Sequence, residues 1–230
     1  MKKIPITSSA LENKNMKIKI CTPVIGKTLK EFLNNLDQVQ EISDMVELRV
    51  DEIKNLTGKD LRLIKGKTKK EAILTSRKKE IILKAFEIGF DYVDIDLEIL
   101  EKEPTFAKAI VGKKTKIILS FHNFIKTPEI KELTFIVNCM RDLKVEVIKI
   151  ATMINNDQDI KNLFKILLSK KKDEKMIMVG MGEKGQITRI LGPLLGSFLT
   201  FASTEYGESA PGQIDINEMK RNYKLLDTNH

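Results

Sequence analysis

The amino-acid sequence predicts an α/β fold of the (β/α)8 TIM barrel type, in which eight parallel strands surround a packed interior and helices cover the outside. Eight short runs rich in β-branched residues recur along the 230 residues, starting roughly 20 to 30 residues apart. Helix-like patterns fill most of the intervals, and this alternation is typical of a parallel sheet. An open doubly wound sheet is the alternative. It requires a glycine-rich phosphate loop after an early strand, and the sequence has none there.

Each element follows from the spacing of its apolar residues, which repeats every two residues in a strand and about every 3.6 in a helix. The expected strands are Met16–Cys21, Met45–Val50, Glu71–Thr75, Tyr92–Leu97, Lys116–Phe121, Val145–Ala151, Met176–Gly180 and Phe198–Ala202. The expected helices are Thr28–Gln40, Ile81–Ile88, Thr105–Val111, Pro128–Arg141, Asp157–Ser169, Gln186–Leu195 and Asp215–Leu226. Pro128 suits the first turn of its helix, and Thr127 is the expected N-cap.

The composition is that of a globular protein with a sizeable core, since 42% of the residues are hydrophobic and 31% are charged. Residues 1–15 read as a polar N-terminal extension, and residues 16–230 as one catalytic barrel, because no linker rich in Pro, Gly or Ser divides them. No apolar run approaches the roughly 18 residues that span a bilayer. The N-terminus is too polar for a signal peptide, so we expect a cytoplasmic protein without a membrane partner.

The formal net charge of +8 suits an anionic partner, which can be a nucleic acid, an acidic membrane or a small substrate. The lysines are dispersed and the few aromatic residues do not interleave with them, so nucleic-acid binding is poorly supported. Cys21 and Cys139 lie far apart without the spacing of metal ligands. We expect both cysteines to be buried small apolar groups, in a strand and on a helix respectively.

The stretch Val145–Ala151 carries a lysine near the end of a strongly apolar strand. Lys149 shares a face with Val147 and Ala151, while the isoleucines on either side of it point the other way. One interpretation is a lysine that extends to solvent at the strand end. If Lys149 is buried instead, lost hydration lowers its pKa and leaves a neutral amine near neutral pH. Such an amine forms a Schiff base with a carbonyl substrate.

Polar residues gather at the carboxyl ends of the expected strands, where a barrel of this type carries its functional groups. They are Glu47, Arg49 and Asp51; Thr75, Ser76 and Arg77; Asp94, Asp96 and Glu98; Ser120 and His122; Lys149; and Thr200, Ala202 and Ser203. An ion-pair network that fills the barrel is an alternative interpretation of these charges, and Asp94 and Asp96 fit either role.

His122 is the candidate for a group that titrates near neutrality, because the one other histidine is the C-terminal residue. Lysine and histidine without a metal cluster or nucleotide loop suggest imine chemistry with a proton shuttle, in which Lys149 forms the imine and His122 moves protons. Arginines suit a substrate carboxylate or phosphate. These residues indicate a lyase or aldolase acting on an anionic carbonyl compound. A catalytically silent barrel that binds anionic metabolites or nucleic acid is the alternative from another class.

In this order and spacing, the motifs resemble those of type I 3-dehydroquinate dehydratase, and the resemblance covers nearly all of the chain from about residue 16 onward. Single motifs are weak signals, but the ordered set is highly specific. The matching stretches are Glu47–Asp51, Thr75–Arg77, Asp91–Glu98, Ser120–Phe124, Ile148–Ala151, Met181–Arg189 and Ser209–Gln213.

The resemblance implies a (β/α)8 barrel that dehydrates 3-dehydroquinate to 3-dehydroshikimate in the shikimate pathway of aromatic amino acid biosynthesis, without metal or dissociable cofactor. It assigns the imine to Lys149 and general acid/base catalysis to His122. It also implies a homodimer with a small anionic substrate as its partner, and a mobile lid over residues 207–213. The implied substrate-binding residues are Glu47, Arg49, Arg77, Arg189, Ser209 and Gln213.

The chain departs from this family pattern after the third expected strand. In many members the arginine there is followed by a longer loop with Glu-Gly-Gly, whose glutamate supports the catalytic histidine. Here Arg77 is followed by Lys78, Lys79 and Glu80 and then directly by apolar helix residues, without the glycines. The residue that supports His122 is therefore open at this point.

Overall fold

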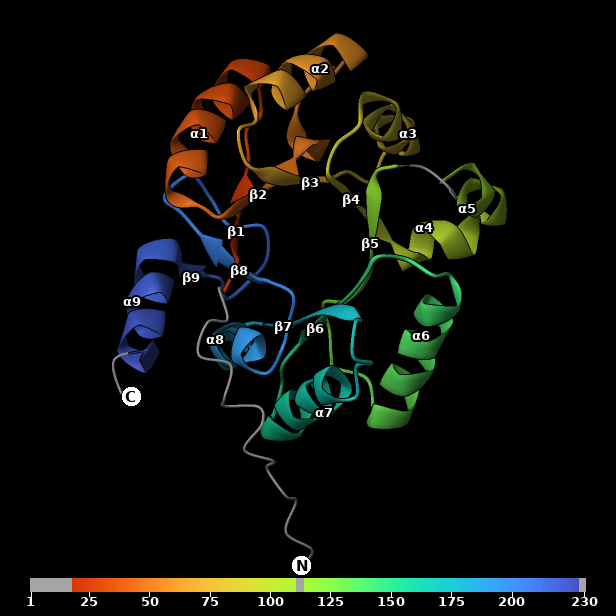
Figure 1. Cartoon of the computed structure of the whole chain (residues 1–230), viewed down its shortest axis with the longest axis vertical. Helices are drawn as coiled ribbons and strands as arrows, with labels where there is room; N and C mark the ends of the chain where they lie inside the picture. Colours follow the sequence, from red (N-terminus) through yellow and green to blue (C-terminus); the bar gives the residue numbers. More distant parts are fainter. Residues whose placement is uncertain (1–17, 111–113, 228–230) are drawn as a thin grey trace, which may run out of the picture.

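Parallel strands follow one another around the centre of the molecule in the order in which they occur in the chain (Figure 1). The computed structural model describes residues 18–110 and 114–227, so the predicted extension over residues 1–15 lies outside the described residues. The hydrogen-bonded order is β7-β6-β5-β4-β3-β2-β1-β8-β9. The strands are β1 (Ile20–Val24), β2 (Met45–Arg49), β3 (Glu71–Thr75), β4 (Tyr92–Asp96), β5 (Lys116–Asn123), β6 (Val147–Met153), β7 (Lys175–Met181), β8 (Thr200–Ser203) and β9 (Ile214–Asp215).

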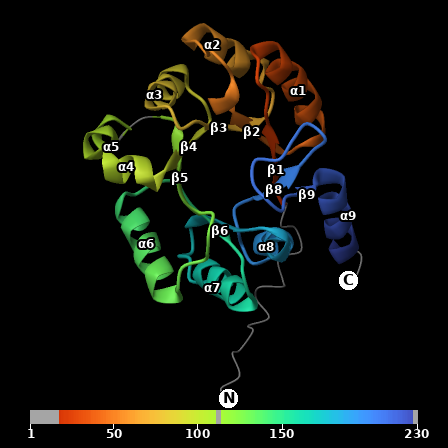
Figure 2. The ribbon, with the colours of Figure 1, turned by 180° about the vertical axis from the view of Figure 1, so that it is seen from behind.

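Helices surround the curled sheet, as views from its two ends show (Figures 1 and 2). The backbone N–H of Phe198, just before β8, donates to the carbonyl of Met176 in β7 at 2.7 Å, so the chain entering β8 contacts the strand at the other end of the order. The predicted fold class is confirmed by this architecture. The helices are α1 (Leu29–Ile42), α2 (Gly58–Lys67), α3 (Lys79–Ile88), α4 (Leu97–Lys102), α5 (Pro104–Ile110), α6 (Ile130–Asp142), α7 (Asp157–Leu168), α8 (Gln186–Leu194) and α9 (Ile216–Asp227), with 3-10 turns at Val50–Glu52 and Glu183–Gly185.

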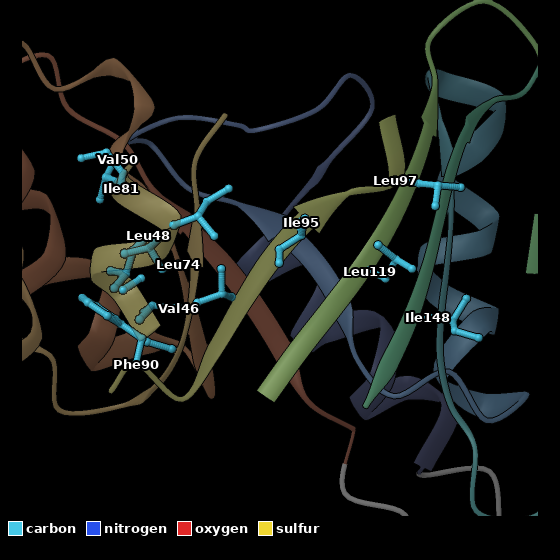
Figure 3. Packing of buried hydrophobic residues seen from close by; sticks show 14 of the residues in the cluster. Val46, Leu48, Val50, Leu74, Ile81, Phe90, Ile95, Leu97, Leu119 and Ile148 are labelled. Atoms are coloured by element: carbon cyan, nitrogen blue, oxygen red, sulfur yellow. The ribbon is translucent and has the colours of Figure 1, made fainter. Parts of the chain in front are cut away.

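The alternation predicted for the lysine strand is present, although β6 begins and ends two residues later than expected. Val147 and Ala151 belong to an apolar cluster that fills the barrel interior. Ile148 and Ile150 belong to the larger cluster between the strands and the helices, part of which is drawn in Figure 3. Successive side chains of a strand point to opposite faces, so one face of β6 reaches the interior and the other anchors the strand to the helical layer.

Four details of the elements differ from the sequence interpretation, each for a local reason. Helix α2 was not expected because only Leu61 and Ile64 on it are buried, too few for an apolar repeat. Helix α4 begins at Leu97, the end of the predicted fourth strand, so Glu98 is an exposed residue of this helix and does not lie on the strand face. Thr127 does not cap α6, because its hydroxyl contacts Thr152 and the Met153 carbonyl, and α6 begins at Ile130.

The fourth difference concerns Cys139, which is exposed on α6, whereas Cys21 is buried in β1 as predicted. Within the described residues, no helix has both the length and the apolar content needed to cross a membrane.

Candidate active site

A cavity of about 240 Å³ lies at the carboxyl ends of the strands, where the barrel rule places functional groups. All eight residues predicted for the site contribute to its wall: Glu47, Arg49, Arg77, His122, Lys149, Arg189, Ser209 and Gln213. The remaining wall residues are Asp51, Thr75, Ser76, Asp94, Asp96, Ile99, Ser120, Phe124, Ala151, Val179, Met181, Phe201 and Ala210. Within the described residues, no group of three or more His, Cys, Asp or Glu side chains is placed to hold a metal ion.

Lys149 is buried at the cavity floor and does not extend to solvent, since its exposed fraction is 6%. Its Nζ donates to Asp94 Oδ2 at 2.7 Å, and Asp94 is also buried. The two residues lie on β6 and β4, on either side of β5, and Ser120 of β5 is in register with Lys149. The ammonium also lies 5.0 Å from the centre of the Phe201 ring. The carboxylate of Asp94 and the ring of Phe201 therefore hold the Lys149 ammonium in place.

The expectation that burial leaves Lys149 with a lowered pKa is wrong. Burial lowers the pKa of Lys149, but the Asp94 and Glu47 carboxylates and the hydrogen bond to Asp94 outweigh burial, so the pKa is raised above that of an ordinary lysine. Burial likewise raises the pKa of Asp94, and the charge of Lys149 reverses this, so that pKa is lowered. A raised pKa for Lys149 and a lowered pKa for Asp94 both favour the charged forms, so the pair consists of an ammonium and a carboxylate.

His122 lies near the end of β5 and is paired through one ring nitrogen. Its Nδ1 lies 2.7 Å from Asp96 Oδ2, and its ring stacks on Phe124 with centroids 6.0 Å apart and an interplanar angle of 12°. The Nδ1 contact leaves Nε2 as the ring nitrogen not engaged by Asp96. About a quarter of the side chain (24%) is exposed, so the imidazole is accessible from the cavity.

A hydrogen-bonded chain joins the buried Glu47 to the predicted lid. The Ser209 hydroxyl donates to Glu47 Oε2 at 2.8 Å, and Thr75 donates to Oε1 at 3.1 Å. The Gln213 side chain in turn accepts from the Ser209 backbone N–H at 2.9 Å and donates to its hydroxyl at 3.2 Å. Residues 162 positions apart in sequence are thereby connected, and the segment over 207–213 closes one wall of the cavity.

Arg189 is a buried cation in the cavity wall, with an exposed fraction of 1%. Among the residues that the structure describes, its Nε has no hydrogen-bond partner, and Nη2 donates to the Pro211 carbonyl at 3.4 Å. Burial lowers the pKa of Arg189 to about 10, against the opposing charges of Glu208 and Glu47. A guanidinium that is charged at neutral pH and incompletely bonded suits a ligand carboxylate or phosphate.

Arg49 and Arg77 occupy the same rim with different surroundings. Arg49 binds both carboxylate oxygens of Asp51, through Nε at 3.2 Å and a terminal nitrogen at 3.0 Å. Arg77 is exposed at the cavity edge. The two arginines therefore differ in how freely their donors can reach a ligand.

One strand face differs from the sequence interpretation, and one open assignment is resolved. On β8 the cavity-lining residue is Phe201, because Thr200 points outward to the Arg189 carbonyl and Ala202 to an outer apolar cluster. The sequence interpretation missed Phe201 because it searched the strand ends for polar residues. Asp94 and Asp96, which fitted either role in the sequence, are the partners of Lys149 and His122.

Similarity to known proteins agrees with this arrangement. The family model described as Type I 3-dehydroquinase matches residues 20–230. The 3-dehydroquinate dehydratase of Coxiella burnetii (strain CbuK_Q154) is 44% identical over 220 residues, covering 90% of this chain and 92% of that protein. The enzyme of the same name from Methanocaldococcus jannaschii is 36% identical over 223 residues, covering 90% of this chain and 99% of that one.

Solved structures give the same result for the fold. Type I 3-dehydroquinate dehydratase from Clostridium difficile, crystallised with covalent modified comenic acid, has a TM-score of 0.79 at 26% identity and covers 93% of this chain and 94% of its own. The 3-dehydroquinate dehydratase structure from Geobacillus kaustophilus HTA426 has a TM-score of 0.81 at 24% identity, with coverage of 93% and 92%. The resemblance read from the motifs and the prediction of a hydro-lyase of this kind are confirmed. The chain belongs to the type I 3-dehydroquinase family.

Proposed function

We propose that the chain dehydrates 3-dehydroquinate to 3-dehydroshikimate through an imine on Lys149, with His122 as general acid and base, in the shikimate pathway. The observation that carries this proposal is the buried Lys149, held in the cavity one strand away from His122. Membership of the family supplies the substrate and the reaction.

Imine formation starts with loss of a proton from the Lys149 ammonium. Asp94 Oδ2 is the acceptor already hydrogen-bonded to Nζ, at 2.7 Å. Transfer converts the ion pair into a neutral amine and a neutral carboxylic acid, and this pair needs less solvation once substrate has excluded water. The free amine adds to the substrate carbonyl, and loss of water then gives the protonated imine.

Dehydration follows because the iminium withdraws electrons from the neighbouring carbon. His122 removes a proton from that carbon, the electron pair moves toward the iminium, and an enamine forms. The electrons then return to expel the hydroxyl one carbon further on, which takes a proton from His122 and leaves as water. Hydrolysis of the conjugated imine releases the product and regenerates the Lys149 amine.

Substrate binding is assigned to the polar groups around the cavity. Arg189 pairs with the substrate carboxylate, which supplies an acceptor for the Nε that has no partner among the described residues. Glu47, Arg49, Arg77, Ser209 and Gln213 bind the remaining oxygens. The segment over 207–213 acts as a lid that excludes water while the imine is present.

An assay of the product separates two alternative functions from the proposed one. A class I aldolase on a similar barrel also uses a lysine, but it breaks a carbon–carbon bond and creates no conjugated enone. A silent binding barrel gives no turnover. Incubation with 3-dehydroquinate should therefore produce the ultraviolet absorption of a conjugated product, and its absence with wild-type protein would contradict the proposed activity.

The imine itself is tested by borohydride trapping during turnover, followed by peptide mass analysis. We expect added mass on the peptide that contains Lys149. Lys149→Ala should lose the adduct and lower kcat at least about 10³-fold, as expected for removal of a covalent catalyst. Lys175→Met is the matched control, because Lys175 is an exposed strand lysine outside the cavity wall, and it should keep both signals. An adduct on another lysine refutes the assignment.

A homodimer and a cytoplasmic location stay predictions from the family resemblance and the sequence. Light scattering coupled to gel filtration tests the first, and a mass of one chain contradicts it. Fractionation of the source cells tests the second.

A further inference from the structure

The family resemblance implies a glutamate after β3 that supports the catalytic histidine, and this chain lacks the expected Glu-Gly-Gly sequence there. Glu80, the nearest acidic residue after Arg77, lies in the first turn of α3 with its side chain exposed. It does not contribute to the cavity wall, whereas His122 does. A different residue must therefore orient the imidazole.

Asp96 meets that requirement through a two-sided contact. Its Oδ2 lies 2.7 Å from His122 Nδ1. Its Oδ1 accepts the backbone N–H of Glu98 at 3.0 Å and so caps the first turn of α4. The carboxylate is thus held by backbone on one side and is directed at the imidazole on the other.

The fold explains why an aspartate at this position reaches the histidine. Strands β4 and β5 are adjacent and parallel, with Asp96 in register with Ser120, and His122 follows two residues later on the same face. Asp96 is also the last residue of β4 and the N-cap of α4, a position at which aspartate is strongly preferred. One short side chain serves both contacts because the strand passes directly into the helix.

We propose that Asp96 is the positioning residue for His122. Asp96 accepts the Nδ1 proton of the neutral imidazole, which leaves the lone pair on Nε2 directed at the substrate. The carboxylate also stabilises the imidazolium that forms when Nε2 takes a proton. The same division of roles between an aspartate and a histidine operates in serine proteases. The inference rests on the proposed function for its catalytic consequence, but the tautomer it assigns is a property of the protein alone.

The decisive variant is Asp96→Asn, which keeps the size of the side chain. Asparagine caps helices about as well as aspartate, so α4 should stay folded. An amide donor facing Nδ1 favours the tautomer with its proton on Nε2, which cannot act as the base. We expect kcat to fall about 10²- to 10⁴-fold, the scale of the corresponding protease substitution, while KM changes less than about threefold.

Two further variants separate positioning from general damage. Glu80→Gln should leave kcat within about twofold, because Glu80 lies outside the cavity wall. Asp96→Glu restores a carboxylate, so its kcat should be at least about tenfold higher than that of Asp96→Asn. If Glu80→Gln costs more than Asp96→Asn, or if Asp96→Asn turns over within threefold of wild type, the inference is wrong.

Side-chain ¹⁵N NMR tests the tautomer without any substrate. The chain has two histidines, so His230→Gln assigns the signals of His122. In the neutral form we expect the wild-type proton on Nδ1 and a shift of population toward Nε2–H in Asp96→Asn. An unchanged tautomer overturns the inference. If wild-type protein lacks dehydratase activity, the proposed function fails, and the NMR result alone decides whether Asp96 positions His122.

Discussion

Asp94→Asn should destabilise the protein by an amount that depends on pH, because it removes the carboxylate that neutralises the buried Lys149. If Lys149 stayed charged, breaking such a pair would cost about 3–5 kcal/mol. The lysine limits this cost by losing its proton once deprotonation costs less than the unpaired charge, which these magnitudes place at about pH 8 and above. From an unfolded-state pKa of about 10.4, deprotonation costs about 1.36 kcal/mol per pH unit, which gives about 4.6 kcal/mol at pH 7, about 3.3 at pH 8 and about 1.9 at pH 9.

The stability of wild type and that of Asp94→Asn should depend differently on pH, because their folded states bind different numbers of protons. In wild type the folded-state pKa of Lys149 is raised, so its contribution is fully present below the unfolded pKa and adds no slope between pH 7 and 9. In Asp94→Asn, at about pH 8 and above, the folded state binds one proton fewer than the unfolded state. Its stability therefore rises with pH, and the gap between the two proteins should narrow by about 1.4 kcal/mol per unit.

The assay is urea denaturation of both proteins at pH 7, 8 and 9, with free energies from linear extrapolation. Glu41→Gln is a matched control, because it breaks the exposed Lys69–Glu41 pair and should change stability by less than about 0.5 kcal/mol at every pH. In Lys149→Met with Asp94→Asn the slope should disappear. A loss below about 1 kcal/mol at pH 8, or a gap that does not narrow, would refute the assigned ion pair.

Two further predictions concern the cavity wall and its lid. Arg189→Lys should raise KM for 3-dehydroquinate about 10- to 100-fold with a smaller effect on kcat, because lysine keeps the charge but loses the paired donors; steady-state kinetics measure this, and an unchanged KM contradicts the assignment. Gly212→Ala should open the lid, since an added Cβ at φ +76° would lie 2.3 Å from the Gly182 carbonyl oxygen. A strain of about 1–3 kcal/mol corresponds to a loss of about 5- to 150-fold in kcat/KM. Cleavage within residues 204–213 by a protease should become faster at the same time, and Gly66→Ala, with open space around its Cβ, should change neither measurement.

The fold and most of the site were accessible from sequence for a geometric reason. Strand side chains alternate, and the carboxyl ends of parallel strands meet at one end of a barrel. Given those two rules, the phase of Lys149 and His122 within their own strands was enough to bring them to one cavity. The rules failed on β8, where Phe201 and not its polar neighbours faces the cavity, because a short strand with both polar and apolar residues does not define its own phase.

No local sequence pattern predicts which carboxylate pairs with Lys149 and which with His122. Lys149 and Asp94 are 55 residues apart, and His122 and Asp96 are 26 apart, so only the register between β4, β5 and β6 decides which carboxylate serves which base. Burial alone predicts a lysine with a lowered pKa. The folded chain places two carboxylates near it and reverses the direction.

The sequence by itself determined the barrel, the family and the eight predicted residues of the cavity wall, because these depend on local periodicity and on motif order. The tertiary structure alone decided that Lys149 rests as an ammonium on Asp94, and that His122 contacts Asp96. Electrostatic interactions depend on the distance between charges in space, and distances of a few ångströms between separate strands are set only when the sheet has closed around them.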